Sequence, residues 1–207
     1  MARRAGAPEV SAGSMADIAF LLLIFFLVTT TIETDAGLDR MLPPWEPPTE
    51  DPPIIKQKNI FTVNINRNGQ LLVEDEIIEI KNLRQKAMAF LDNGGAPSGS
   101  PEYCNYCQGA KDGSSSDNPD KAIISLKNDR ETQYSTYITV QNELVGAYND
   151  LRNREAMRLF KKNFVDMEAE YLNPETSDEV KEELKEKVKR IQGLFPQKLS
   201  EAETSAN

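Results

Sequence analysis

Residues 14–30 read SMADIAFLLLIFFLVTT, and this stretch decides the organisation of the chain. From Ile18 to Val28 every side chain is apolar, and Asp17 at the head of the run is the only ionisable group in it. A helix from Met15 to Ile32 would be about 27 Å long at about 1.5 Å per residue. The hydrocarbon core of a membrane is about 30 Å thick, and the small residues before Met15 can extend the helix to that length. We therefore predict a transmembrane helix at residues 12–34.

A cleaved signal peptide is the alternative, because it also lies at the N-terminus behind basic residues. Its apolar core is normally about 7–15 residues long and is followed by a small-x-small cleavage site. Here the run ends in Thr29-Thr30-Thr31-Ile32-Glu33 without a clear site of that kind, and it begins with an acid. These features favour a span that stays in place.

The charges on either side of the stretch predict its orientation. Arg3 and Arg4 precede it, whereas Glu33 and Asp35 open an acidic region after it. Basic flanks remain in the cytoplasm, so residues 1–11 are expected inside and everything from Glu33 onward is expected to be translocated.

Asp17 is the candidate functional residue. Insertion of an acid costs about 2.5–3.5 kcal/mol at the centre of a span and less toward its end, so such a residue suggests proton or ion handling. The alternative is a structural hydrogen bond to a partner helix. The same helix face carries residues expected to pack against partner helices or line a pore: Phe20, Leu21, Ile24, Val28 and Thr31.

Composition excludes several classes of function. The 207 residues carry a net charge of −9 and no histidine, which argues against nucleic acid as a partner and removes the commonest metal ligand. The sequence contains no nucleophile elbow and no phosphate-binding loop. We expect no catalytic residues, no cofactor and no metal, and therefore not an enzyme.

A proline-rich segment follows the predicted span. Six of the twelve prolines lie between Pro43 and Pro53, and such segments are extended at about 3.1 Å per residue. We assign residues 35–58 to a linker, which is either a plain spacer or a tether whose extension is regulated.

Residues 59–207 are predicted to form an α+β domain with helices packed on one face of a sheet. Asn68-Gly69 between two apolar runs predicts a hairpin with a type I′ turn. Apolar spacing predicts a helix from Ile80 to Leu91 and a longer one from Tyr134 that continues to Phe160 and Phe164. A buried strand is expected at residues 122–126, and a short charged helix is expected to begin at Ser177.

Residues 93–120 form a loop insertion without hydrophobic periodicity, predicted to be a surface excursion. It contains Cys104 and Cys107. A disulfide is favoured over a redox pair or a zinc site, because the motif lies in a Gly/Ser-rich loop and lacks two further ligands. Asp112, Asp117 and Asp120 lack calcium-loop spacing and are interpreted as solvated.

Several of these motifs together resemble the ExbD/TolR family of biopolymer transport proteins. Residues 14–30 are similar to the single span of that family, with its Asp near the start and its Thr exit. Leu42-Pro43-Pro44 resembles the Leu-Pro that often follows the span, and Asn64-x-x-x-Asn68-Gly69 and the strand at 121–126 follow in the family's order. The insertion and the long C-terminal region exceed the usual domain and resemble Bacteroidota-type members. In these a final strand would come late, at residues 198–202.

The resemblance implies a proton-channel subunit of a bacterial inner-membrane motor, with the bulk of the chain in the periplasm. It implies a pair of such chains inside a pentamer of a polytopic ExbB-like partner, in contact with lipid, and a TonB-like transducer that energises outer-membrane transport. By motif position, Asp17 would carry the proton. TolR-like envelope maintenance and a signal-anchored periplasmic interaction or redox protein that uses Cys104 and Cys107 are the alternatives. A flagellar stator is disfavoured, because the C-terminal half of this sequence shows no motif for binding peptidoglycan.

Overall fold

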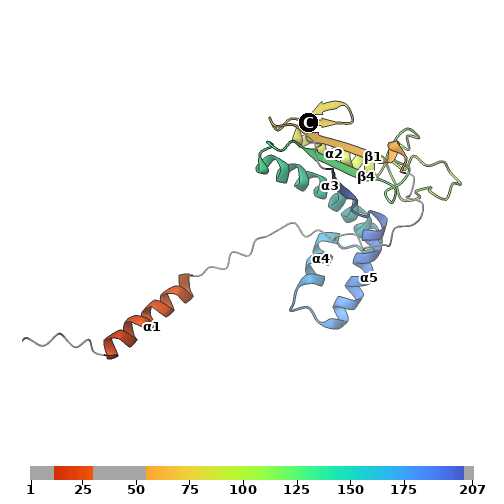
Figure 1. Ribbon diagram of the computed structural model, residues 1–207. Coiled ribbons are helices and arrows are strands. Elements are labelled where there is room, and N and C mark those ends of the chain that lie inside the picture. Colours follow the sequence, from red (N-terminus) through yellow and green to blue (C-terminus); the bar gives the residue numbers. More distant parts are fainter. Residues whose placement is uncertain (1–11, 30–54, 203–207) are drawn as a thin grey trace, which may run out of the picture. The chain divides into compact units, whose positions relative to one another are not determined.

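The computed structural model describes residues 12–29 and 55–202 (Figure 1). The chain divides into two units between Asp51 and Pro52. In the first unit the described residues form one helix, α1 (Ala12–Thr29). Residues 30–34 of the predicted span, the N-terminal flank 1–11 and the proline-rich segment up to residue 54 lie outside the described residues. A search of 12–29 and 55–202 found no helix with both the length and the apolar character needed to cross a membrane.

The second unit is built on a five-stranded mixed sheet with the order β3-β2-β1-β4-β5. The strands are β1 (Ile60–Ile65), β2 (Leu71–Val73), β3 (Glu76–Ile78), β4 (Ile123–Asn128) and β5 (Leu199–Ala202). β2 pairs antiparallel with β1 and β3, whereas β4 pairs parallel with β1 and β5. The α+β class is confirmed, and so is the late strand expected near residues 198–202.

The hairpin between β1 and β2 is confirmed, but the predicted turn type is wrong. Residues 66–70 form a five-residue loop, and only Gly69 in it has a positive φ, +75°. The Asn66 side chain shapes this loop, because its Oδ1 accepts the backbone N–H groups of Asn68 and Gln70 at 3.0 and 2.9 Å. The two positive φ values that a type I′ turn requires occur in the next hairpin, at Glu74 and Asp75.

One face of the sheet is covered by two helices, α2 (Ile80–Leu91) and α3 (Tyr134–Phe160) (Figure 1). Side chains alternate along β1, so that Phe61, Val63 and Ile65 are buried while the intervening residues are half-buried. The opposite face is more open, and Ile77 on it is exposed. The main core is formed by these strand residues together with Leu71, Val73, Leu83, Ala87, Phe90, Leu91, Ala122, Ile124, Leu126, Val140, Leu144, Ala147, Tyr148, Leu151 and Phe195.

The long helix departs from its prediction at both ends. Tyr134 begins α3 but is 76 % exposed, so it does not line the buried face. α3 ends at Phe160 because Lys161 adopts a left-handed conformation, with φ of 58°. Phe164, which was expected to continue α3, instead begins a separate helix, α4 (Phe164–Leu172).

A second, smaller core joins the end of α3 to α4 and α5 (Asp178–Leu194) (Figure 1). Ser177 precedes α5, with Asp178 and Glu179 in the first turn, where negative charge suits the helix dipole. At 17 residues α5 is longer than the short helix predicted. The buried residues of this second core are Ala156, Phe164, Met167, Leu184, Val188 and Ile191.

Candidate functional site

Asp17 lies in the second turn of α1, and the first turn of this helix contains no acidic residue. Helical geometry places Phe20, Leu21 and Ile24 on the same side of α1 as Asp17, because they follow it by three, four and seven residues. All four side chains are exposed. The side chain of Val28, and Thr31 as a whole, lie outside the described residues.

The chemistry available at α1 is limited to one carboxyl group on an apolar surface. A carboxyl group binds and releases one proton, and in apolar surroundings only its neutral form is tolerated. An exposed apolar surface of this kind marks a site of contact with other apolar groups, from protein or lipid. Within residues 12–29 and 55–202, no cluster of His, Cys, Asp or Glu is suited to hold a metal ion.

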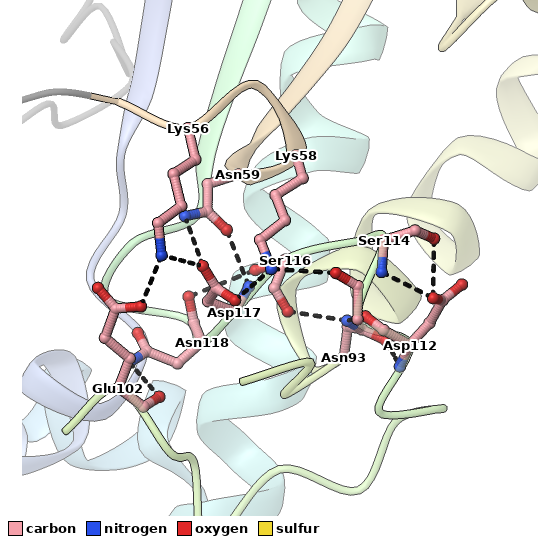
Figure 2. A network of polar contacts seen from close by, with 11 residues as sticks. Lys56, Lys58, Asn59, Asn93, Glu102, Asp112, Ser114, Ser116, Asp117 and Asn118 are labelled. Carbon is pink, nitrogen blue, oxygen red and sulfur yellow. Dashed lines mark hydrogen bonds and ion pairs between the residues drawn. The ribbon is translucent and has the colours of Figure 1, made fainter. Parts of the chain in front are cut away.

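A second polar site lies where the chain enters the folded unit, around Asp117 (Figure 2). The Asp117 side chain is 2 % exposed. Lys58 Nζ lies 2.5 Å from its Oδ1, and Lys56 Nζ lies 3.1 Å from its Oδ2. Asn59 Nδ2 donates a 3.3 Å hydrogen bond to the same Oδ2, while Asn59 Oδ1 accepts the backbone N–H of Asp117 at 2.8 Å. A buried carboxylate is thus held by three side chains that immediately precede β1.

The lysines of this site have further partners in the insertion (Figure 2). Lys56 Nζ donates to Glu102 Oε2 at 3.0 Å, and Lys58 Nζ donates to the Gly113 carbonyl at 3.0 Å. We call the five side chains of Lys56, Lys58, Asn59, Glu102 and Asp117 the Asp117 anchor.

Opposing effects act on the pKa of Asp117. Burial raises the pKa of this carboxyl, but hydrogen bonds from Lys58, Lys56 and Asn59 outweigh burial and hold the pKa below its ordinary value. The bonds to Glu102 and Asp117 raise the pKa of Lys56. Both shifts favour the charged forms, so Asp117 and Lys56 are ionised at neutral pH.

The insertion contains no helix or strand and many of its residues are exposed, as expected of a surface excursion, but it is folded around a buried amide. Asn93 Nδ2 donates to the carbonyls of Asp112 and Ser116 at 2.9 and 2.8 Å, and Asn93 Oδ1 accepts the Asp112 N–H at 3.0 Å. The backbone at Gly95 lies so close to the backbone at Asp112 that a Cβ on Gly95 would be 2.1 Å from the Asp112 carbonyl oxygen. The insertion therefore has a defined backbone that presents Asp117.

The three aspartates of the insertion have separate partners. The Asp112 carboxylate accepts bonds from the backbone and hydroxyl of Ser114, which lower its pKa. Asp120 lies 3.1 Å from Lys198 Nζ, and Asp117 belongs to the anchor. The interpretation of all three as solvated is wrong for Asp117, because three side chains replace its water.

Cys104 and Cys107 are joined by a disulfide, with their Cα atoms 5.5 Å apart, and both residues are buried. Between them, Tyr106 donates a 2.7 Å hydrogen bond to the Leu194 carbonyl and packs edge-on against Phe195. Burial is the main cause that raises the pKa of Tyr106 to about 12. The disulfide turn thus attaches the insertion to the end of α5.

Inference from the sequence missed Lys56, Lys58, Asn59 and the partnership of Asp117. The contacts of Asp117 with Lys56 and Asn59 join residues 61 and 58 positions apart. No local sequence pattern predicts such a pairing, because the lysines fall in the segment assigned to the linker and Asp117 lies among serines and glycines.

Comparison with known families identifies the chain. Residues 3–152 match the family described as biopolymer transport protein ExbD/TolR. The match includes α1, β1 to β4, the insertion and most of α3. The chain belongs to the ExbD/TolR family, which confirms the resemblance drawn from the sequence. A search of curated proteins found no match.

Proposed function

We propose that this chain is the proton-carrying subunit of an inner-membrane motor that energises TonB-dependent transport across the outer membrane. The observation that carries the proposal is the single carboxyl group of Asp17 in α1, followed by eleven apolar residues from Ile18 to Val28. Membership in the ExbD/TolR family supports biopolymer transport as the setting.

In this proposal α1 and the apolar residues beside it form a single span with the N-terminus in the cytoplasm. Its side chains from Ile18 to Phe26 are exposed and apolar on all sides of the helix, which suits surroundings of lipid and partner helices. The folded unit from residue 55 onward is then periplasmic.

The chemical step is a cycle of protonation at one carboxyl group. Asp17 takes a proton from the periplasmic side, moves in its neutral form past apolar partner surfaces, and releases the proton toward the cytoplasm. Each proton that crosses supplies about 2.3 kcal/mol per 100 mV of membrane potential. That energy is comparable with the about 2.5–3.5 kcal/mol needed to bury a carboxylate in a span, so the potential suffices to alternate the state of Asp17.

The partners belong to the same proposal. Membership in the ExbD/TolR family supports work in a complex with membrane partners, and we propose, as the family resemblance implies, that two copies of this chain lie within a pentamer of an ExbB-like polytopic protein. The folded unit passes the motion to a TonB-like transducer. A TolR-like role in envelope maintenance would use the same Asp17 chemistry with a different periplasmic partner. The redox alternative finds less support, because Cys104 and Cys107 are bonded and only 2 % and 6 % exposed.

The decisive experiment replaces the carboxyl group while keeping its shape. Asp17→Asn should assemble with the polytopic partner but abolish energised uptake, because an amide does not cycle charge. Asp17→Glu is the matched control, since it keeps an ionisable group one methylene further out, and it should retain part of the activity. Wild-type uptake by an assembled Asp17→Asn protein would refute the motor mechanism. Co-purification followed by identification of the periplasmic partner separates TonB-type from Tol-type output.

A further inference from the structure

The chain enters the folded unit at its most central strand. β1 is the middle strand of the sheet, with β2 on one side and β4 on the other. The residues immediately before it are Lys56 and a single 3₁₀ turn, η1 (Gln57–Asn59). Any tension that arrives along the chain from α1 therefore reaches Lys56 to Asn59 before it reaches β1.

Three of the four side chains in this entry segment, residues 56–59, bind the same carboxylate. Lys56, Lys58 and Asn59 all contact Asp117, and Asn59 makes a reciprocal pair with it, donating to its side chain and accepting from its backbone. Asn59 is 4 % exposed, so this pair is shielded from water. Bonds to a charged group in such surroundings are stronger than exposed ion pairs.

Asp117 is itself braced by the insertion. The Gly95 N–H donates to the Ser116 carbonyl at 2.8 Å, and the Ala96 N–H donates to the Asp117 carbonyl at 3.2 Å. These bonds tie the backbone on either side of Asp117 to the first residues of the insertion, directly after α2.

The insertion is in turn fixed to α3. Arg154 of α3 binds both carboxylate oxygens of Asp92 at 2.6 and 2.8 Å, and Asp92 also accepts the Gln108 N–H. A continuous series of polar contacts therefore leads from the entry segment through Asp117 and the insertion to α3.

We propose that the Asp117 anchor is the mechanical junction of this protein, which takes up tension from the linker and passes it to α3 instead of to the hydrogen bonds of β1. Asp117 and Asn59 are positioning residues in this role. The role in transmission rests on the proposed function, whereas the anchor as a closed contact does not.

The anchor is tested in the full-length chain assembled with its membrane partner. Asp117→Asn keeps the volume of the side chain and removes its charge. Asp120→Asn is the matched control, because Asp120 lies in the same insertion and pairs with Lys198 at an exposed position. Hydrogen exchange is followed at the backbone N–H of Asp117, which is bonded to Asn59 Oδ1. Substrate uptake and internal pH are measured on the same strains.

In Asp117→Asn we expect exchange at that amide to rise roughly thirtyfold, the factor that corresponds to a loss of about 2 kcal/mol when the bonds to the charged group are removed. We expect uptake to fall while proton entry continues, and Asp120→Asn to behave as wild type in both. If Asp117→Asn does not accumulate, Lys56→Gln with Lys58→Gln should give the same pattern to a smaller extent. Unchanged exchange in these variants would overturn the anchor as a closed contact. Faster exchange with wild-type uptake would overturn its role in transmission.

Failure of the proposed function has a different signature. If Asp17→Asn transports normally, the motor assignment fails whatever the exchange at Asp117. If Asp17→Asn is inactive while its Asp117 amide exchanges as in wild type, loss of the motor does not disturb the anchor. The uptake measured for Asp117→Asn then tests only the role of the anchor in transmission.

Discussion

Acidification should remove the stability that Asp117 provides, and the sign of this effect follows from the anchor. The folded-state pKa of Asp117 lies below its ordinary value of about 3.9. Folding therefore favours the ionised form. Its contribution is fully present above about pH 4 and is lost as the pH falls through the folded-state pKa.

The size of the contribution at neutral pH depends on the partners of Asp117. A buried bond to a charged group contributes about 1.5–3 kcal/mol, whereas an exposed ion pair contributes about 0.2–1 kcal/mol. The side chains of Lys58 and Lys56 are 27 % and 52 % exposed, so both can recover hydration when the charge is removed. The asparagine in Asp117→Asn still accepts a bond from Asn59. We therefore expect Asp117→Asn to lower the free energy of unfolding by about 2 kcal/mol at pH 7.

The measurement is urea-induced unfolding of the full chain in detergent, followed by far-ultraviolet circular dichroism at several pH values. The difference between wild type and Asp117→Asn should be constant at neutral pH and shrink below about pH 4. Asp120→Asn should differ little from wild type, because its ion pair is exposed. A wild-type advantage that stays constant or grows on acidification would refute this account of the anchor.

Three further predictions concern other parts of the chain. Cys104→Ser with Cys107→Ser should leave uptake nearly intact and should lower the free energy of unfolding by at most about 2 kcal/mol, because the disulfide closes a short loop. Loss of all uptake at a normal protein level would favour the redox alternative. A Gly-Ser replacement of equal length for residues 43–53 should uncouple proton entry from uptake, as shown by internal pH and uptake measured together, and no change in either would indicate a plain spacer. Gly95→Ala should destabilise the protein because of its 2.1 Å contact, whereas Gly193→Ala, with open space around it in α5, should stabilise it by up to about 1 kcal/mol in the same urea assay.

Hydrophobic periodicity was sufficient to predict most of the helices and strands. Ile80, Leu83, Ala87, Phe90 and Leu91 are spaced by three and four residues, and they form α2 with the last four buried. Such patterns are local, since each turn of a helix places its own apolar residues on one face. Backbone conformation at single residues was less predictable. Nothing in the sequence around Lys161 signals that it takes a left-handed conformation and ends α3 before Phe164.

The turns were also predictable only in part from the sequence. Asn68-Gly69 correctly marked a hairpin, because glycine accepts the positive φ that the reversal needs. The type of turn was decided by the Asn66 side chain, which closes a longer loop. Asp75 is of a residue type that tolerates a positive φ, but Glu74 is not, and the conformation of both residues follows from the pairing of β2 with β3.

The sequence by itself determined the family, the α+β class and the place of Asp17, because each depends on a contiguous motif or a short repeating pattern. Only the tertiary structure decided that the insertion is ordered and that Asp117 binds Lys56, Lys58 and Asn59. These contacts join residues about 60 positions apart. A lysine or an aspartate in a polar segment has the same local pattern whether it is solvated or buried. Its partner is set by the fold that brings the two segments together, and burial in that fold then makes the bond strong.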